Sequence, residues 1–146
     1  MRKLIRFLRL PASDRKALKK AVLLLWAVRI GLWILPFQSL RDLVSRKKKS
    51  PVVASNDESA SVQKIARSVK LMSRYVPAAT CLVQALVTVA LLEEAGVPAC
   101  LRIGVDKTTA GKFEAHAWVE SMGKVVIGGT DVDVSRYTVL QAVQGT

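Results

Sequence analysis

The sequence has few of the residues on which metal sites and disulfide frameworks depend. It contains one histidine, His116, and two cysteines, Cys81 and Cys100, in 146 residues. No metal-ligand spacing can be made from these three residues, so no metal site is predicted. Two cysteines do not form the framework of a small secreted domain, and a single bridge between them is the less favoured alternative to free thiols. The sequence has no glycine-rich phosphate loop, and no cofactor is predicted.

Acidic residues are scarce in the first third of the chain. Residues 1–50 hold 14 Lys and Arg against two Asp, whereas residues 51–146 hold nine basic and nine acidic residues, so the net charge of +12 belongs to one segment. Because no nucleic-acid-reading motif is recognisable in that segment, nucleic-acid binding is not predicted. Apolar residues make up 51% of the sequence, which at this length is enough for one domain with a core but not for two ordinary domains.

The longest apolar run, residues 21–35, falls short of a membrane span. A span needs about 20 mostly apolar residues, and Arg29 lies near the middle of this run. Basic residues flank it on both sides and give no orientation signal, and no small-residue cleavage site follows it. A buried or partner-facing helix is therefore favoured. An interfacial helix and a true span stay open, with membrane contact through residues 15–50. The expected location is the cytoplasm or the inner face of its membrane.

Two parts are predicted along the chain: a basic helical arm, residues 1–50, and a core, residues 51–146. A proline precedes and another follows the helical pattern of residues 15–35, and both favour helix boundaries there. Residues 46–58 run from basic to polar and predict a linker.

Within the core, the hydrophobic period changes from 3.6 to 2. The first period predicts helices over residues 58–74 and from Cys81 to the glycine at position 96. The second predicts strands over residues 99–105, 113–121 and 124–127, and a last short strand that includes residues 136–140. Helices followed by an antiparallel sheet are typical of an α+β fold.

Cys81 and His116 are the candidate nucleophile and base. Cys81 begins the apolar helical run 81–92, where the positive end of a helix favours the reactive thiolate. His116 follows thirty-five residues later in a predicted strand, and such pairs are brought together by the fold rather than by the sequence. Alone, each residue is more often structural. Their placement together indicates a catalytic site, whereas Cys100 is interpreted as a packing residue.

A third residue would orient the histidine through its other ring nitrogen. Asp131 is favoured because it lies just beyond the next strand; Asp133, or no acid at all, is the alternative. Glu120 lies in the same strand as the histidine, about 13 Å along it, which is too far for contact. An oxyanion hole would combine the backbone N–H of the nucleophile with one more donor, such as Gln84.

The residues around the candidate pair resemble those of a known family. The Cys-Leu pair and the Ala-His-Ala-Trp-Val-Glu motif occur in tandem, and the segments between and after them keep the order and spacing of the transglutaminase-like leader peptidases of lasso-peptide biosynthesis, the B proteins. The matching segments are residues 80–82, 85–86, 91–92, 96–99, 101–105, 113–120 and 123–128. The closely matching block runs from about residue 80 to 129.

This resemblance implies a papain-like cysteine peptidase built on a transglutaminase-type core. Cys81 matches the nucleophile of the family and His116 its general base. Some members have an aspartate at the end of the strand, where this sequence has Gly128 and Gly129. The role of the acid would then pass to Asp131.

The resemblance also implies the substrate and partners. The substrate would be a ribosomally made precursor peptide, whose leader is removed so that a separate ATP-dependent macrolactam synthetase can use the freed amine. Residues 1–50 lack a three-stranded winged-helix pattern, so the chain resembles the split form that works with a separate small leader-recognition protein. The basic arm is the predicted docking surface for it. The alternatives are another acyl-transfer enzyme on the same core, a transglutaminase or arylamine acyltransferase, and a non-catalytic membrane-peripheral adaptor.

Overall fold

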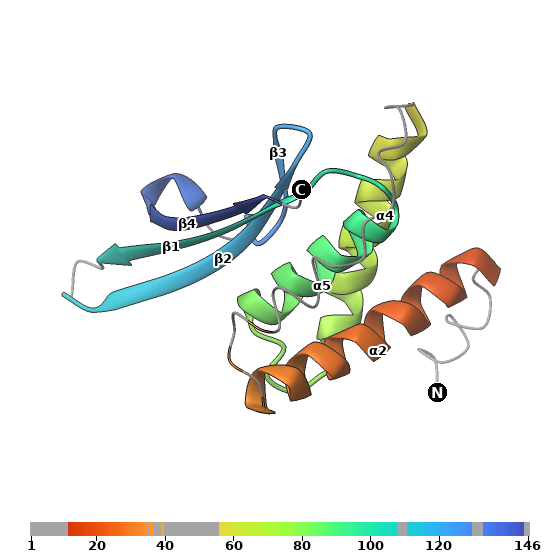
Figure 1. The fold of residues 1–146 in the computed structure, drawn as a ribbon, viewed down its shortest axis with the longest axis horizontal. Helices are drawn as coiled ribbons and strands as arrows, with labels where there is room; N and C mark the ends of the chain where they lie inside the picture. The colour runs from red at the N-terminus through yellow and green to blue at the C-terminus, as the bar shows by residue number, and fades with distance from the viewer. Residues whose placement is uncertain are drawn as a thin grey trace.

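A layer of helices packs against a four-stranded sheet (Figure 1). The computed structural model describes residues 12–34, 36, 39, 56–107, 111–129 and 133–144. In these residues the helices come first, and the predicted α+β class is confirmed. The elements are α2 (Ala12–Ile34), α4 (Asn56–Ser73), α5 (Cys81–Glu94), β1 (Cys100–Lys107), β2 (Phe113–Ser121), β3 (Lys124–Ile127), the 3-10 helix η1 (Val134–Arg136) and β4 (Thr138–Gln144).

The sheet is antiparallel, with strand order β3-β2-β1-β4. In the β1–β2 ladder, Gly104 lies opposite His116. A two-residue turn joins β2 to β3, with φ of 52° at Met122 and 72° at Gly123. Positive φ at both central residues is the type I′ geometry that matches the twist of a hairpin. The predicted strands 113–121 and 124–127 and the turn between them are thus confirmed.

Helix α5 lies between the other helices and the sheet (Figure 1), and it packs against α2, α4 and β2. It is apolar on nearly every side, as a helix covered on both faces must be. Its C-terminal end is a Schellman motif, in which Gly96 has φ of 76° and the N–H of Val97 donates to the carbonyl of Leu92 at 2.9 Å. Its buried side chains are Val83, Ala85, Leu86, Val87, Thr88, Val89, Leu91 and Leu92.

One hydrophobic core joins the three described helices to the sheet. Helix α2 contributes Leu18, Ala21, Leu25 and Val28, and β2 contributes Ala117 and Val119. The predicted boundary between residues 50 and 51 lies outside the described residues. Among the described helices, none has both the length and the hydropathy that a membrane crossing requires.

The last strand differs from its prediction. Of the predicted strand residues 136–140, Arg136 belongs to η1 and Tyr137 follows it, whereas residues 138–140 are strand, because β4 begins at Thr138 and continues to Gln144. The physical reason is a local cap: the side chain of Asp133 accepts a hydrogen bond from the backbone N–H of Ser135 at 3.0 Å and closes the short helical turn.

Candidate functional site

Cys81 is the first residue of α5. Thr80 precedes it in an extended conformation and makes no side-chain cap hydrogen bond, and the first turn contains no acidic residue. The first-turn N–H groups of a helix have no intrahelical partner, so their partial positive charge is concentrated at the N-terminal end of α5, where the Cys81 thiol lies. The Cys81 side chain is half-buried against the hydrophobic core.

Gln84 turns back toward the start of α5. Its Nε2 donates a hydrogen bond to the carbonyl of Ala79 at 2.9 Å, while its backbone N–H donates to the carbonyl of Thr80 at 3.0 Å. The side chain therefore ties the segment before the helix to the first turn. The predicted role of Gln84 as an oxyanion donor stays a prediction.

Both cysteines are free thiols. Cys100 begins β1, where its Sγ lies 3.9 Å from the carbonyl oxygen of Leu101. The bridge between Cys81 and Cys100 that the sequence left open is absent from the structure.

His116 is held by a backbone carbonyl. Its Nε2 lies 2.5 Å from the carbonyl oxygen of Gly128, the residue that follows β3. A carbonyl can only accept, so Nε2 carries the proton, and in the neutral ring Nδ1 is the nitrogen with the free lone pair. Gly128 has φ of 85°, and a Cβ at this position would lie 2.7 Å from the carbonyl oxygen of Ala117 and 2.8 Å from the Cβ of Trp118. Only glycine fits where this carbonyl is presented.

Two aromatic rings enclose the imidazole. The ring of Trp118 stacks beside it at a centroid distance of 6.3 Å, and the ring of Tyr137 lies 5.4 Å away. Both rings are buried. Gly104, opposite His116, leaves the space that they fill, because a Cβ there would lie 2.9 Å from the Cβ of Tyr137 and 3.1 Å from the Cη2 of Trp118. Sequence reasoning missed Tyr137, which comes from the far end of the chain.

An ion-pair cluster holds Tyr137 from outside. Arg136 contacts Glu114 at 2.9 Å and Asp106 at 3.1 Å, and its guanidinium lies over the Tyr137 ring at 5.2 Å from the centroid. These residues come from η1, β2 and β1, so they join the strands at the end of the sheet that carries His116.

Cys81 and His116 belong to elements that pack together, α5 and β2, but no hydrogen bond joins their side chains. Ala117 and Val119 point into the core that α5 helps to form, and side chains alternate along a strand. His116 and Trp118 therefore lie on the opposite face of the sheet. The expectation that a first-turn cysteine meets the histidine directly is not met in this conformation.

The position of His116 along β2 bears on how the two groups could meet. β3 pairs with residues 119–121 of β2 only. Among the described residues, no strand pairs with β2 on that side at His116, so we call this the open edge of β2; the imidazole contacts the carbonyl of Gly128, which lies against Ala117 and Trp118. At this edge no neighbouring strand of the described chain encloses the ring on that side, while the Cβ of His116 stays on the face of the sheet opposite α5.

The predicted acids are placed as follows. Asp131 lies outside the described residues. The carboxylate of Asp133 accepts from the hydroxyl and the backbone N–H of Ser135, and these hydrogen bonds lower its pKa. Burial of Glu120 opposes its ionisation, but hydrogen bonds from Trp118 and Arg102 outweigh this and hold its pKa below the ordinary value. Glu120 is therefore engaged away from the imidazole, as its distance along the strand predicted.

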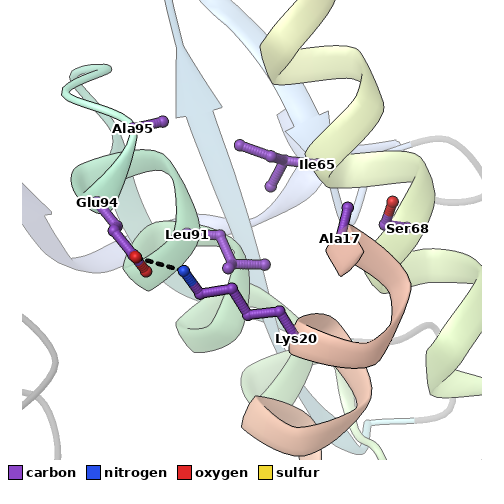
Figure 2. Close-up of a pocket in the computed structure, with 7 residues that line it drawn as sticks. All are labelled: Ala17, Lys20, Ile65, Ser68, Leu91, Glu94 and Ala95. Carbon is purple, nitrogen blue, oxygen red and sulfur yellow. Dashed lines mark hydrogen bonds and ion pairs between the residues drawn. The ribbon is translucent and has the colours of Figure 1, made fainter. Parts of the chain in front are cut away.

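A separate hollow of about 250 Å³ lies between α2, α4 and α5 (Figure 2). Its lining is mostly apolar, and an ion pair between Lys20 and Glu94 crosses one side of it. Neither Cys81 nor His116 lines this hollow. The lining residues are Ala17, Lys20, Ile65, Ser68, Leu91, Glu94 and Ala95. Within the described parts of the chain, no group of three or more His, Cys, Asp and Glu side chains is arranged to hold a metal ion.

Comparison with known proteins places this site in a family. Neither the curated proteins nor the solved structures include a significant match to the chain. The sequence profile of the transglutaminase-like superfamily matches residues 22–142, from the middle of α2 into β4. This match spans the cysteine-bearing helix, the histidine-bearing strand and the sheet, and it indicates a core of the cysteine protease or acyltransferase type. The chain belongs to the transglutaminase-like superfamily.

Proposed function

We propose that the chain is a cysteine peptidase that removes the leader from a ribosomally synthesised lasso-peptide precursor. The observation that carries this proposal is the hydrogen bond from Nε2 of His116 to the carbonyl of Gly128. It selects the tautomer in which Nδ1 is a proton acceptor, as a general base requires. The Cys-Leu and Ala-His-Ala-Trp-Val-Glu motifs support the choice of substrate.

In the proposed reaction, Nδ1 of His116 removes the proton from the Cys81 thiol. The thiolate attacks the carbonyl carbon of the last leader residue, and first-turn N–H groups of α5 stabilise the oxyanion. The imidazolium then protonates the departing amine, which becomes the N-terminus of the core peptide. Water hydrolyses the thioester and releases the leader as a carboxylate.

This reaction requires the imidazole to move toward α5. We propose that it rotates over the open edge of β2 when the precursor is bound, and that a protein acceptor continues to hold Nε2. Asp131 is the proposed acid for this role. The proposed partners are the precursor peptide, a separate small leader-recognition protein and the macrolactam synthetase that uses the freed amine.

The direct test is cleavage of a precursor peptide in the presence of the recognition protein, followed by mass spectrometry. We expect Cys81→Ala and His116→Ala to lose activity by about a thousandfold or more, whereas Cys100→Ala, the matched control, retains it. Two fragments whose masses sum to the precursor plus water indicate hydrolysis, and an adduct indicates acyl transfer. Full processing by Cys81→Ala would refute the proposal.

Thiol reactivity gives a second test that needs no substrate. Alkylation of Cys81 by iodoacetamide is expected to be faster than that of Cys100 at neutral pH, because only Cys81 lies at a helix N-terminus. If His116 assists, His116→Ala slows the labelling of Cys81 and leaves that of Cys100 unchanged. Equal labelling of the two thiols would argue for a non-catalytic protein.

A further inference from the structure

The solvent-facing side of α2 changes character along its length. Its exposed side chains recur at helical spacing, and they are basic in the first part and apolar in the second. Trp33 is 85% exposed and Trp26 45% exposed. We call these residues the α2 stripe: Lys16, Lys19, Lys20, Leu23, Trp26, Ile30, Trp33 and Ile34.

The opposite side of α2 is already used by the core, through Leu25 and Val28 among others. Apart from the half-exposed Arg29, the second half of the helix is therefore apolar on both its buried and its exposed sides. A single exposed leucine needs no explanation, but two tryptophans with three aliphatic neighbours form a contiguous patch of the kind that marks an interaction surface. Figure 1 shows α2 on the side of the helical layer away from the sheet, so the stripe does not belong to the Cys81–His116 site.

The charge of the α2 stripe indicates the kind of partner that it would bind. The stripe contains no acidic residue, and of its three lysines one, Lys20, forms an ion pair with Glu94. The surrounding sequence is also basic, because residues 1–50, which include the three lysines of the stripe, carry 14 basic residues and two acidic ones. A basic helix that exposes tryptophan and aliphatic side chains is suited to an anionic lipid surface, where lysines contact headgroups and tryptophans settle at the interface.

We propose that the α2 stripe binds the surface of an anionic phospholipid bilayer. The helix lies in the plane of the interface, with the apolar half of the stripe entering between headgroups and Leu25 and Val28 remaining in the protein core. The sheet then faces away from the lipid. This inference does not depend on the proposed peptidase activity, and its test does not measure that activity.

The test is co-sedimentation of the full chain with vesicles of phosphatidylglycerol and phosphatidylcholine, against vesicles of phosphatidylcholine alone. We expect binding to the anionic vesicles that weakens as salt is raised. The double variant Trp26→Ser/Trp33→Ser should bind at least about tenfold more weakly, because each substitution removes a large apolar side chain that the membrane would bury. The double variant Phe113→Ser/Leu140→Ser is the matched control. It removes side chains that are 77% and 66% exposed on the sheet, and should bind as the wild type does.

Thermal unfolding of both double variants establishes that each is folded before its binding is compared. Equal binding to both kinds of vesicle, or unchanged binding by Trp26→Ser/Trp33→Ser, would overturn the proposal. The proposal would also be overturned if the chain binds no vesicles and if replacing the two tryptophans abolishes its complex with the leader-recognition protein or its self-association. In that case the stripe is a protein interface.

Discussion

Replacing Gly128 by alanine tests whether the backbone around His116 is as tightly constrained as the structure indicates. The residue has φ of 85°, where an alanine costs about 1–2 kcal/mol relative to glycine. Its new Cβ would also lie 2.7–2.9 Å from the Ala117 carbonyl oxygen and from the Cβ and Cα of Trp118. These neighbours are backbone or buried, so relief requires the strands to shift, at a cost of about 1–3 kcal/mol. The free energy of unfolding should fall by about 2–5 kcal/mol in total.

Gly123 provides the matched control. It has φ of 72°, and a Cβ there would meet nothing within 4 Å. Gly123→Ala should therefore cost only the conformational part, about 1–2 kcal/mol. The two variants are compared by urea unfolding, monitored by the near-ultraviolet circular dichroism of the tryptophans. A Gly128→Ala variant no less stable than Gly123→Ala would show that the crowding around this carbonyl is not present in solution.

Three further predictions concern single side chains. Burial raises the pKa of Glu93, whose carboxylate oxygens have no hydrogen-bond partner. The folded state therefore favours the protonated form, and stability falls as pH rises through that pKa. Glu93→Gln should raise the melting temperature more at neutral than at mildly acidic pH, and an equal gain at both pH values would contradict this. Hydrogen bonds from Ser135 lower the pKa of Asp133. The contribution of Asp133 to stability is therefore present above its ordinary pKa of 3.8 and is lost as pH falls through the lowered pKa. Asp133→Asn should melt at a lower temperature than the wild type at neutral pH, the difference should disappear in strong acid, and precursor cleavage should be unaffected. Asp131→Ala should lower the cleavage rate at least about a hundredfold if this residue holds the imidazolium, and a rate equal to that of the wild type would leave the Gly128 carbonyl as the acceptor.

The elements that were predicted correctly are those whose signal is local. Residues 113–116 alternate apolar and polar side chains, a Met-Gly turn follows residue 121, and residues 124–127 are rich in β-branched side chains; both strands occur with the predicted bounds. The start of β4 was missed because the Asp133 cap, which closes η1, competes with the strand pattern that follows it.

The geometry of the candidate site was less predictable, because it depends on long-range packing. Alternation correctly grouped His116 with Trp118, but it did not tell which face α5 would cover. Tyr137 lies twenty-one residues beyond His116 and reaches it only through the β1–β4 pairing. Gly104 carried a usable signal, since a glycine within an apolar strand indicates close approach by another group.

The double coverage of α5 limits which half of the candidate pair can adapt to a substrate. Displacing this helix would expose side chains on two sides at once, so the hydrogen-bonded amides beyond its first turn should exchange with solvent only through events close to global unfolding. The sulfur is attached to a helix that the core holds on two sides. In the proposed reaction, the movement that brings the imidazole to the thiol would therefore come from the strand that carries His116.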